Sequence, residues 1–215
     1  MKSLKELYRI GIGPSSSHTM GPRNAAEQFL AKHPDAKSFE VTLYGSLAAT
    51  GKGHMTDIAI IDTLEPHAPL DLKWEPEIFL PFHPNGMLFK SKDENGKVTD
   101  EWTVFSVGGG ALAEEGIDNS ASPDIYEMTK MSQILGWCER TGRSYWEYVQ
   151  QCEESDIWDY LHEVWKTMSE AVERGLEQEG ALPGPLNLRR KAATYYIKAN
   201  GYKDNLKSRG LVFSY

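Results

Sequence analysis

The run Gly11-Ile-Gly-Pro-Ser-Ser-Ser-His-Thr-Met-Gly-Pro22 constrains the fold more than any other stretch of the chain. Its glycines permit backbone angles that other residues avoid, and Pro14 stiffens the turn. Pro22 suits the first position of a helix, and His33-Pro34 ends the apolar periodicity that follows it. The run therefore predicts a tight polar turn that leads into a helix over 23–32, with one apolar face made of Ala25, Ala26, Phe29 and Leu30.

The same turn has the composition of a binding site for a small anion. Four hydroxyl donors surround His18, namely those of Ser15, Ser16, Ser17 and Thr19. Unpaired amides and the positive end of the helix dipole would face this loop and favour a carboxylate or phosphate. The alternative is that Ser17 or Thr19 caps the helix and His18 bonds to nearby backbone. The segment is not a Walker loop, because it lacks the Gly-Lys-Ser/Thr ending.

Length and charge limit the classes of protein to consider. A chain of 215 residues with 40% hydrophobic content can bury the core of one domain with a short appendage. The formal charge of -8 argues against broad binding to nucleic acid or anionic membranes. We find no apolar run of the roughly 20 residues that span a membrane and no signal-peptide core, so we expect a cytoplasmic location.

Before residue 70 the pattern predicts one strand and a second helix. Residues 39–44 alternate as a strand does, and a loop over 45–53 follows. Thr56 or Asp57 can cap a short helix that Pro66 stops, which would place His54 just before a helix N-terminus. A buried strand over 58–61 is the competing interpretation, since a short apolar run does not decide between the two.

After residue 75 the pattern becomes β-like and then helical. Strands are expected at 78–80, 87–89 and 99–107, with Asn95-Gly96 as the turn of a hairpin. Gly108-Gly-Gly110 could bring its amides close to a ligand or form a simple turn. Long helices are expected at 126–151 and 155–179, with their aromatic residues in the core, and a composition break falls at 180–185. Cys138 and Cys152 are expected to be reduced, because no metal-ligand pattern surrounds them.

Several motifs in one order resemble a known family. The run up to Gly21, the segments Tyr44-Gly-Ser-Leu and Gly51-Lys-Gly-His-Met-Thr-Asp57, the step His83-Pro-Asn-Gly86 and the turn Gly108–Gly110 are similar to the N-terminal beta domain of iron-sulfur L-serine dehydratases. The resemblance implies an α+β fold, a mixed sheet with flanking helices, similar also to the allosteric substrate-binding domain of D-3-phosphoglycerate dehydrogenase. It implies a beta domain over 1–180, and over 181–215 a linker toward a catalytic alpha domain that this chain lacks.

The resemblance also implies a reaction. These enzymes convert L-serine to pyruvate and ammonia, with a 4Fe-4S cluster whose open iron site binds the serine hydroxyl. Two distant cysteines do not supply a cluster's ligands, so we expect the cluster in the alpha domain and no metal in this chain. This chain would bind L-serine, partner the iron-sulfur alpha domain and self-associate into a homodimer. The substrate-binding residues would be Ser15, Ser16, Ser17, Thr19, Asn85, Gly109 and Gly110.

The base that removes the α-proton is expected to be a histidine. His54 and His18 are the candidates, because each sits in a glycine-rich loop near a predicted helix start. Lys52 would favour the neutral imidazole of His54 and Asp57 would oppose it, so the sequence leaves the protonation state open. Met55 departs from the small residue expected after the histidine.

Two other functions compete with this reading. One is a regulatory module that binds serine or a related anion without catalysis. The other is a hydrolase using Ser17 and His18, which we disfavour because adjacent residues cannot easily face each other and no nucleophile elbow is present.

Overall fold

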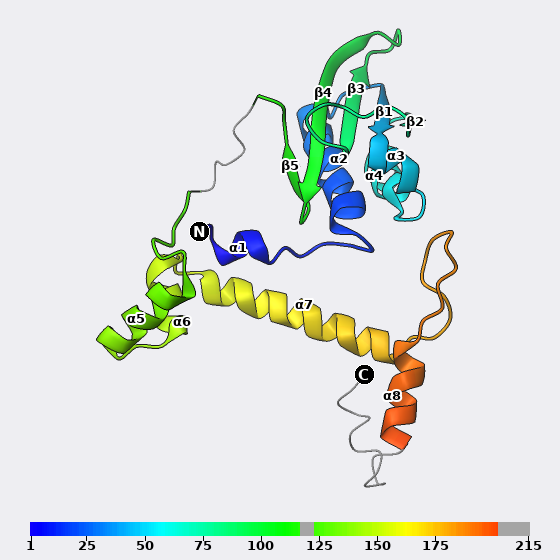
Figure 1. Cartoon of the computed structure of the whole chain (residues 1–215). Coiled ribbons are helices and arrows are strands. Elements are labelled where there is room, and N and C mark those ends of the chain that lie inside the picture. Colours follow the sequence, from blue (N-terminus) through cyan, green and yellow to red (C-terminus); the bar gives the residue numbers. More distant parts are fainter. Residues whose placement is uncertain (117–122, 202–215) are drawn as a thin grey trace. The chain divides into compact units, whose positions relative to one another are not determined.

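The computed structural model describes residues 1–116 and 123–201 and contains one five-stranded mixed sheet (Figure 1). The strands are β1 (Ser38–Tyr44), β2 (Leu70–Glu75), β3 (Gly86–Lys92), β4 (Val98–Gly108) and β5 (Ala111–Ala113), in the order β2-β1-β3-β4-β5. β1 pairs parallel with β2, and every other pair is antiparallel. With helices packed on the sheet, this confirms the predicted α+β class.

The chain divides into two compact units, residues 1–155 and residues from 156 onward. The first holds the sheet with α1 (Leu4–Leu7), the π-helix η1 (Ser16–Met20), α2 (Gly21–Lys32), α3 (Gly45–Thr50), α4 (Thr56–Leu64), α5 (Met131–Thr141) and α6 (Tyr145–Cys152). The second holds α7 (Ile157–Glu177) and α8 (Ala192–Gly201). The predicted domain boundary at 180 and the cytoplasmic location stay predictions. Among the described residues, no helix has the length and apolarity to cross a bilayer.

The core lies where α2 and α4 pack on one face of the sheet. Phe39, Val41 and Leu43 alternate along β1 and are fully or almost fully buried, as strand periodicity requires. Phe29 of α2 lies at the centre, in ring contact with Phe39, Phe89 and Trp102. The predicted helices after Pro22 and around residues 58–64 are thereby confirmed, and the strand alternative for 58–61 is wrong.

The edge of the sheet differs from expectation. The predicted strand at 78–80 is a loop, and Ile78 and Phe79 in it are exposed. One of the two edge strands is instead β2, where half-buried Leu70, Leu72 and Trp74 alternate with exposed charged residues. This alternation is a strand signal that the sequence analysis passed over, because the acidic and basic residues of an edge strand mask it.

The predicted helix over 126–151 is two helices with a turn between them. Gly142 adopts a left-handed conformation (φ +68°) that ends α5, and Ser144 caps α6. Glu147 completes a capping box, and its hydrogen bonds from the amide and hydroxyl of Ser144 lower its pKa. A glycine C-cap followed by a serine N-cap thus breaks one apolar periodicity into two helices.

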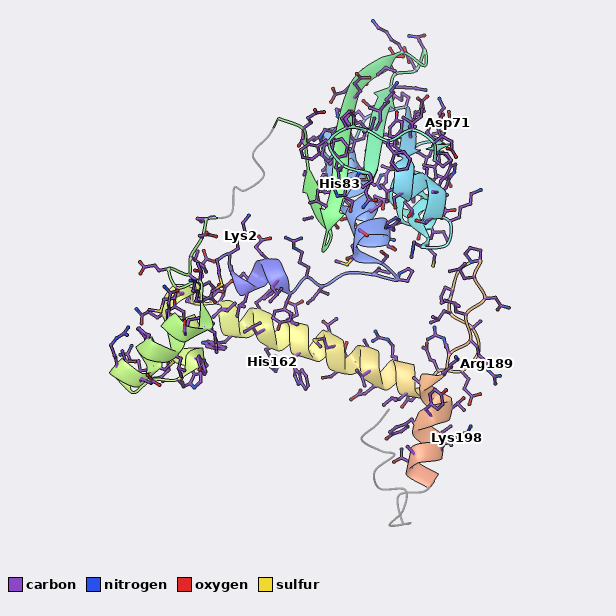
Figure 2. The ribbon with its side chains drawn as sticks, in the orientation of Figure 1. Lys2, Asp71, His83, His162, Arg189 and Lys198 are labelled. Atoms are coloured by element: carbon purple, nitrogen blue, oxygen red, sulfur yellow. The ribbon has the colours of Figure 1, made fainter. Side chains whose placement is uncertain are left out.

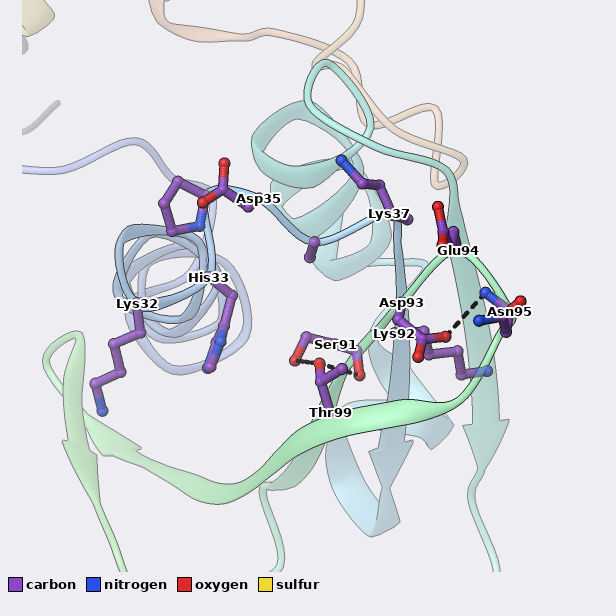
Figure 3. A pocket seen from close by; sticks show the side chains of 12 residues that line it. Lys32, His33, Asp35, Lys37, Ser91, Lys92, Asp93, Glu94, Asn95 and Thr99 are labelled. Atoms are coloured by element: carbon purple, nitrogen blue, oxygen red, sulfur yellow. Dashed lines mark hydrogen bonds between the residues drawn. The ribbon is translucent and has the colours of Figure 1, made fainter.

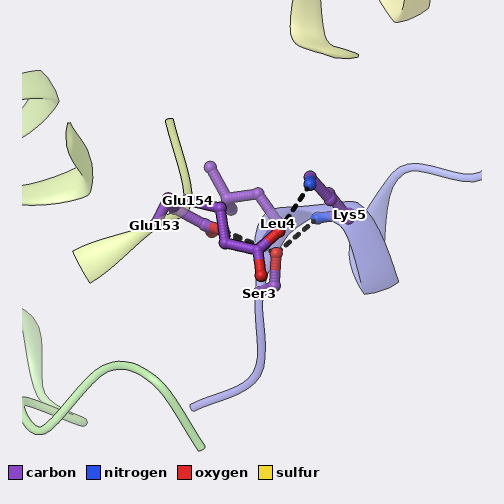
Figure 4. A network of polar contacts seen from close by, with 5 residues as sticks. All are labelled: Ser3, Leu4, Lys5, Glu153 and Glu154. Carbon is purple, nitrogen blue, oxygen red and sulfur yellow. Dashed lines mark hydrogen bonds and ion pairs between the residues drawn. The ribbon is translucent and has the colours of Figure 1, made fainter. Parts of the chain in front are cut away.

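The N-terminal segment is held against the end of α6 by one carboxylate (Figure 4). Glu153 accepts hydrogen bonds from the Leu4 amide at 2.7 Å and the Ser3 hydroxyl at 2.6 Å, and from the Tyr126 hydroxyl at 2.6 Å. Burial opposes ionisation, but these donors lower the pKa of Glu153 overall. Lys5 adds an ion pair to Glu154 at 3.1 Å. Residues 3–5, which begin the segment leading to Gly11, are therefore held in place by these contacts.

Glu40 on β1 faces away from the core and is surrounded by lysines. Lys92 approaches its carboxylate to 2.6 Å, Lys73 to 2.9 Å and Lys90 to 3.9 Å. The Glu40 side chain is only 12% exposed. Hydrogen bonds from Lys92 and then Lys73 lower its pKa from 4.5 to about 2.

Glu40→Gln should reduce the free energy of unfolding by roughly 1 to 3 kcal/mol near neutral pH, because charge-assisted hydrogen bonds are lost. The folded-state pKa lies below the unfolded value, so this stabilisation is complete above pH 4.5 and disappears as the pH falls toward 2. Urea unfolding of both proteins at pH 6.5 and near pH 2.5 measures it. An equal difference at both pH values would contradict this account.

Candidate active site

Two loops that are far apart in the sequence meet beside the N-terminal end of α2. The first is the turn Ser15–Met20, and the second is the segment 51–55 between α3 and α4. The sequence predicted a tight polar turn here, but the first loop has a regular conformation. It is a turn of π-helix that runs directly into α2, with Ser15 as its N-cap.

Backbone hydrogen bonds within this turn change the predicted anion site. Ser15 accepts the amide of His18 on its hydroxyl and the amides of Thr19 and Met20 on its carbonyl. The amide of Gly21 bonds to the carbonyl of Ser16. The amides at the start of α2 are therefore already used, and the positive end of the helical run lies at Ser16 instead.

Two threonines tie the loops together. The hydroxyl of Thr19 donates to the His54 carbonyl at 2.7 Å, and the hydroxyl of Thr56 donates to the His18 carbonyl. Both threonine side chains are buried. Thr56 therefore bonds to the other loop and does not cap α4, whose N-cap is Met55 in a left-handed conformation (φ +58°). The His54 carbonyl is thus bonded from the first loop, and the His18 carbonyl from the first residue of α4, directly after the second loop.

The two predicted histidines lie side by side. Their ring centroids are 4.9 Å apart. In His18, Nδ1 is 2.9 Å from the Ser17 hydroxyl and Nε2 is 3.2 Å from the Ser46 hydroxyl. The expectation that Ser17 and His18 cannot easily face each other was wrong, because in this turn the Ser17 hydroxyl reaches Nδ1 of its neighbour's ring.

Electrostatics favour a neutral His18. Burial lowers the pKa of His18, and the nearby charge of His54 lowers it further, while a hydrogen bond with Ser46 opposes these effects. A neutral imidazole keeps one nitrogen as an acceptor, so His18 can accept a hydrogen bond or a proton.

Ser46 is the site residue that the sequence analysis missed. It lies in α3, where a loop over 45–53 had been predicted, and its amide donates to the Pro84 carbonyl at 3.0 Å. Gly45 makes this possible, because it adopts φ +49° and an added Cβ would lie 2.7 Å from the Pro84 carbonyl oxygen. The Tyr44-Gly-Ser-Leu motif was the available signal.

Asn85 follows Pro84, whose carbonyl accepts the Ser46 amide. Asn85 is buried, and its side-chain amide donates to the Ser106 carbonyl at 3.1 Å. Its carbonyl accepts the Ser106 amide at 3.0 Å. These bonds join the residue before β3 to β4. A direct contact between Asn85 and substrate stays a prediction.

Gly109 and Gly110 form a left-handed turn that packs on η1 and α2. Their φ values are +59° and +76°. The Gly109 carbonyl accepts from Arg9 at 2.9 Å, and the Gly110 carbonyl accepts from Asn24 at 2.9 Å. An added Cβ on Gly110 would crowd Met20. The turn therefore borders the first loop, and substrate binding by its amides stays a prediction.

Two further histidines, His33 and His83, have different contacts. His33 pairs with Asp100 at 3.0 Å and borders a polar hollow of about 470 Å³, whose lining mixes lysines with acidic residues (Figure 3). His83, marked in Figure 2, accepts the Asn85 amide on Nδ1 at 3.2 Å. His18, by contrast, contacts two serine hydroxyls and a second imidazole.

The described residues contain no group of three or more His, Cys, Asp or Glu side chains placed to hold a metal ion. Cys138 and Cys152 are free and lie on α5 and α6. Thiolate ligation of a cluster therefore does not fit these residues.

Comparison with known proteins agrees with the resemblance seen in the motifs. The sequence profile described as "Serine dehydratase beta chain" matches residues 3–75 and 67–117, more than half of the chain. The chain belongs to the serine dehydratase beta chain family. Both histidine loops, Ser46 and the Gly108–Gly110 turn fall inside the matched ranges.

Full-length relatives extend the likeness beyond the beta chain profile. The chain is 32% identical to L-serine dehydratase of Haemophilus influenzae over 251 residues, which cover 93% of this chain and 55% of that protein. It is 32% identical to L-serine dehydratase 1 of Escherichia coli and 33% identical to L-serine dehydratase of Mycobacterium bovis, covering 90% and 92% of this chain and 53% of each relative. The chain thus spans about half the length of the curated relatives it matches.

The protonation state of His18 gives a direct test of the site's electrostatics. The ring protons of His18, followed by NMR between pH 4 and 9, should titrate below pH 6.5. His54→Gln should move that midpoint upward, because a neighbouring positive charge is removed while burial remains. A midpoint above 6.5 in the unmodified protein would contradict the arrangement.

Proposed function

We propose that this chain is the substrate-binding part of an L-serine ammonia-lyase, which converts L-serine to pyruvate and ammonia. Two observations support the proposal. The chain belongs to the serine dehydratase beta chain family, and its relatives carry the name L-serine dehydratase. The second observation is the pair of histidine loops, where hydroxyl groups and imidazoles that could bind serine and accept its proton lie close together.

The serine carboxylate binds at the start of the helical run. Ser16 is exposed at that point, and Ser15 and Ser17 flank it. The hydroxyl of Ser16 makes no hydrogen bond with another described residue, so it is available to an anion. The dipole of the π-helix and α2 adds to this attraction. Thr19 contributes to substrate binding indirectly, because its hydroxyl donates to the His54 carbonyl and so positions the second loop.

His54 is the better candidate for the base that removes the α-proton. Both ring nitrogens of His18 lie within hydrogen-bond distance of serine hydroxyls, whereas no described side chain bonds to those of His54. Its backbone is nevertheless fixed by Thr19. His54 is therefore positioned and able to accept a proton, while His18 orients hydroxyls beside it.

Loss of the β-hydroxyl needs an electrophile, and the described residues hold no group of side chains that could place a metal ion there. The family resemblance implies an iron-sulfur cluster, and the residues described here do not fit one. The contribution of the described residues is to bind the substrate and take the proton, and the cluster would be held by the iron-sulfur alpha domain. Without that partner the same site could only bind serine or a related anion, which is the regulatory alternative.

Kinetics of the enzyme assembled with its cluster-bearing part separate binding from proton removal. Ser16→Ala should mainly raise KM, by the equivalent of roughly 1 to 3 kcal/mol for one charge-assisted hydrogen bond. His54→Ala should lower kcat by about 100-fold or more with the cluster spectrum unchanged. His18→Ala is the control for the rival base. Equal small losses in all three variants would place the base outside this chain.

Anaerobic reconstitution of this chain alone with iron and sulfide should leave it colourless and inactive on L-serine, because it has only two cysteines. Visible absorption spectra and pyruvate release measure this. A stable 4Fe-4S spectrum together with pyruvate production would overturn the proposed division of labour.

A further inference from the structure

The helix α7 carries an apolar stripe along its length, although its aromatic residues were expected in the core. The α7 stripe consists of Leu161, Trp165, Met168 and Val172, spaced by four, three and four residues. Trp165 is 66% exposed, Met168 52% and Val172 59%, while Leu161 is half-buried. This spacing is that of one face of a helix that packs against another helix.

The charges of α7 lie away from this stripe. Glu163, Glu170 and Glu177 follow each other at seven-residue intervals on a different face. On one side, the stripe is bordered by His162 and Ser169. His162 is labelled on α7 in Figure 2. A covering surface would therefore be apolar at its centre and would not need to neutralise charge.

The second unit has too little interior to explain a helix with two apolar faces. Among its described residues 156–201, the buried hydrophobic side chains are Ile157, Val164, Ala193 and Ala199. Ile157 and Val164 lie on a face of α7 beside the stripe. Units with so small a core are marginal alone, and large exposed apolar patches mark interaction sites.

The comparisons indicate what covers the stripe. The beta chain profile ends at residue 117, yet the Haemophilus influenzae relative aligns over 93% of this chain and so reaches into α7. Only 55% of that relative lies within the aligned stretch. The helices after residue 156 thus align with the relative beyond the beta chain profile, and a large part of the relative lies outside the aligned stretch.

We propose that the α7 stripe is the surface on which the remaining part of an L-serine dehydratase docks, through an apolar helical face of its own. This inference rests on the proposed function, since the partner is taken from the same enzyme. Trp165 is the central anchor, because a large exposed aromatic ring in the middle of an apolar stripe contributes most when it is covered.

The probe is the part of the Haemophilus influenzae relative outside the aligned stretch, produced together with this chain. Light scattering after gel filtration should show a one-to-one complex. Trp165→Glu and Val172→Glu should each weaken the complex at least tenfold, measured as Kd by surface-immobilised titration. Trp146→Glu is the matched control, since Trp146 is 57% exposed but lies on α6, and it should leave Kd unchanged.

The aligned part of the relative, mixed with the same probe, establishes that the probe can bind. If that pair associates and this chain does not, the inference is wrong. Equal binding by Trp165→Glu would also overturn it. A dimer of this chain alone that Trp165→Glu abolishes would show that a second copy is the occupant. Assembly does not require turnover, so a stripe-dependent complex without activity on L-serine would reject the proposed function and not the docking surface.

Discussion

Two hydroxyl-to-carbonyl hydrogen bonds hold the candidate site together. Thr19 bonds to the backbone of His54 across 35 residues of sequence, and Thr56 bonds to the backbone of His18 across 38. Both threonines are buried and both bonds are partly buried, so loss of either hydroxyl would take a hydrogen-bond donor away from a histidine carbonyl. The packing of α2 on α4 brings the loops together, and the threonines then set the distance between the imidazoles. Every role proposed for the histidines depends on that distance.

Much of the fold could be predicted from local patterns. The helix after Pro22, β1 and the Asn95-Gly96 hairpin follow from proline, alternation and turn chemistry, and Gly96 indeed adopts φ +76°. The failures occurred where one pattern hid another. The charges of β2 masked an edge strand, and the apolar period of α5 and α6 continued across a glycine cap. Trp165 was expected in the core because sequence does not show which polypeptide covers a helix face.

The sequence indicated candidate residues for the site but not the hydrogen bonds between them. His18, His54 and the hydroxyls of the first loop stood out because they cluster in sequence between glycines. The contacts of Ser46 with His18 and of Thr56 with its carbonyl depend on helix packing, which a single sequence does not display. The same holds for Asn85, whose amide joins two strand ends. The resemblance to serine dehydratases pointed to both loops, and the structure adds the hydrogen bonds that connect them.

We propose that the two histidine loops form one ligand site whose geometry the threonines maintain. The most direct measurement is an L-serine titration followed by NMR on the ring protons of His18 and His54, in the unmodified protein and in Thr56→Val. We expect both rings to respond with one common Kd, and Thr56→Val to weaken this binding while the fold is retained. A response from only one ring, or unchanged binding in Thr56→Val, would contradict it.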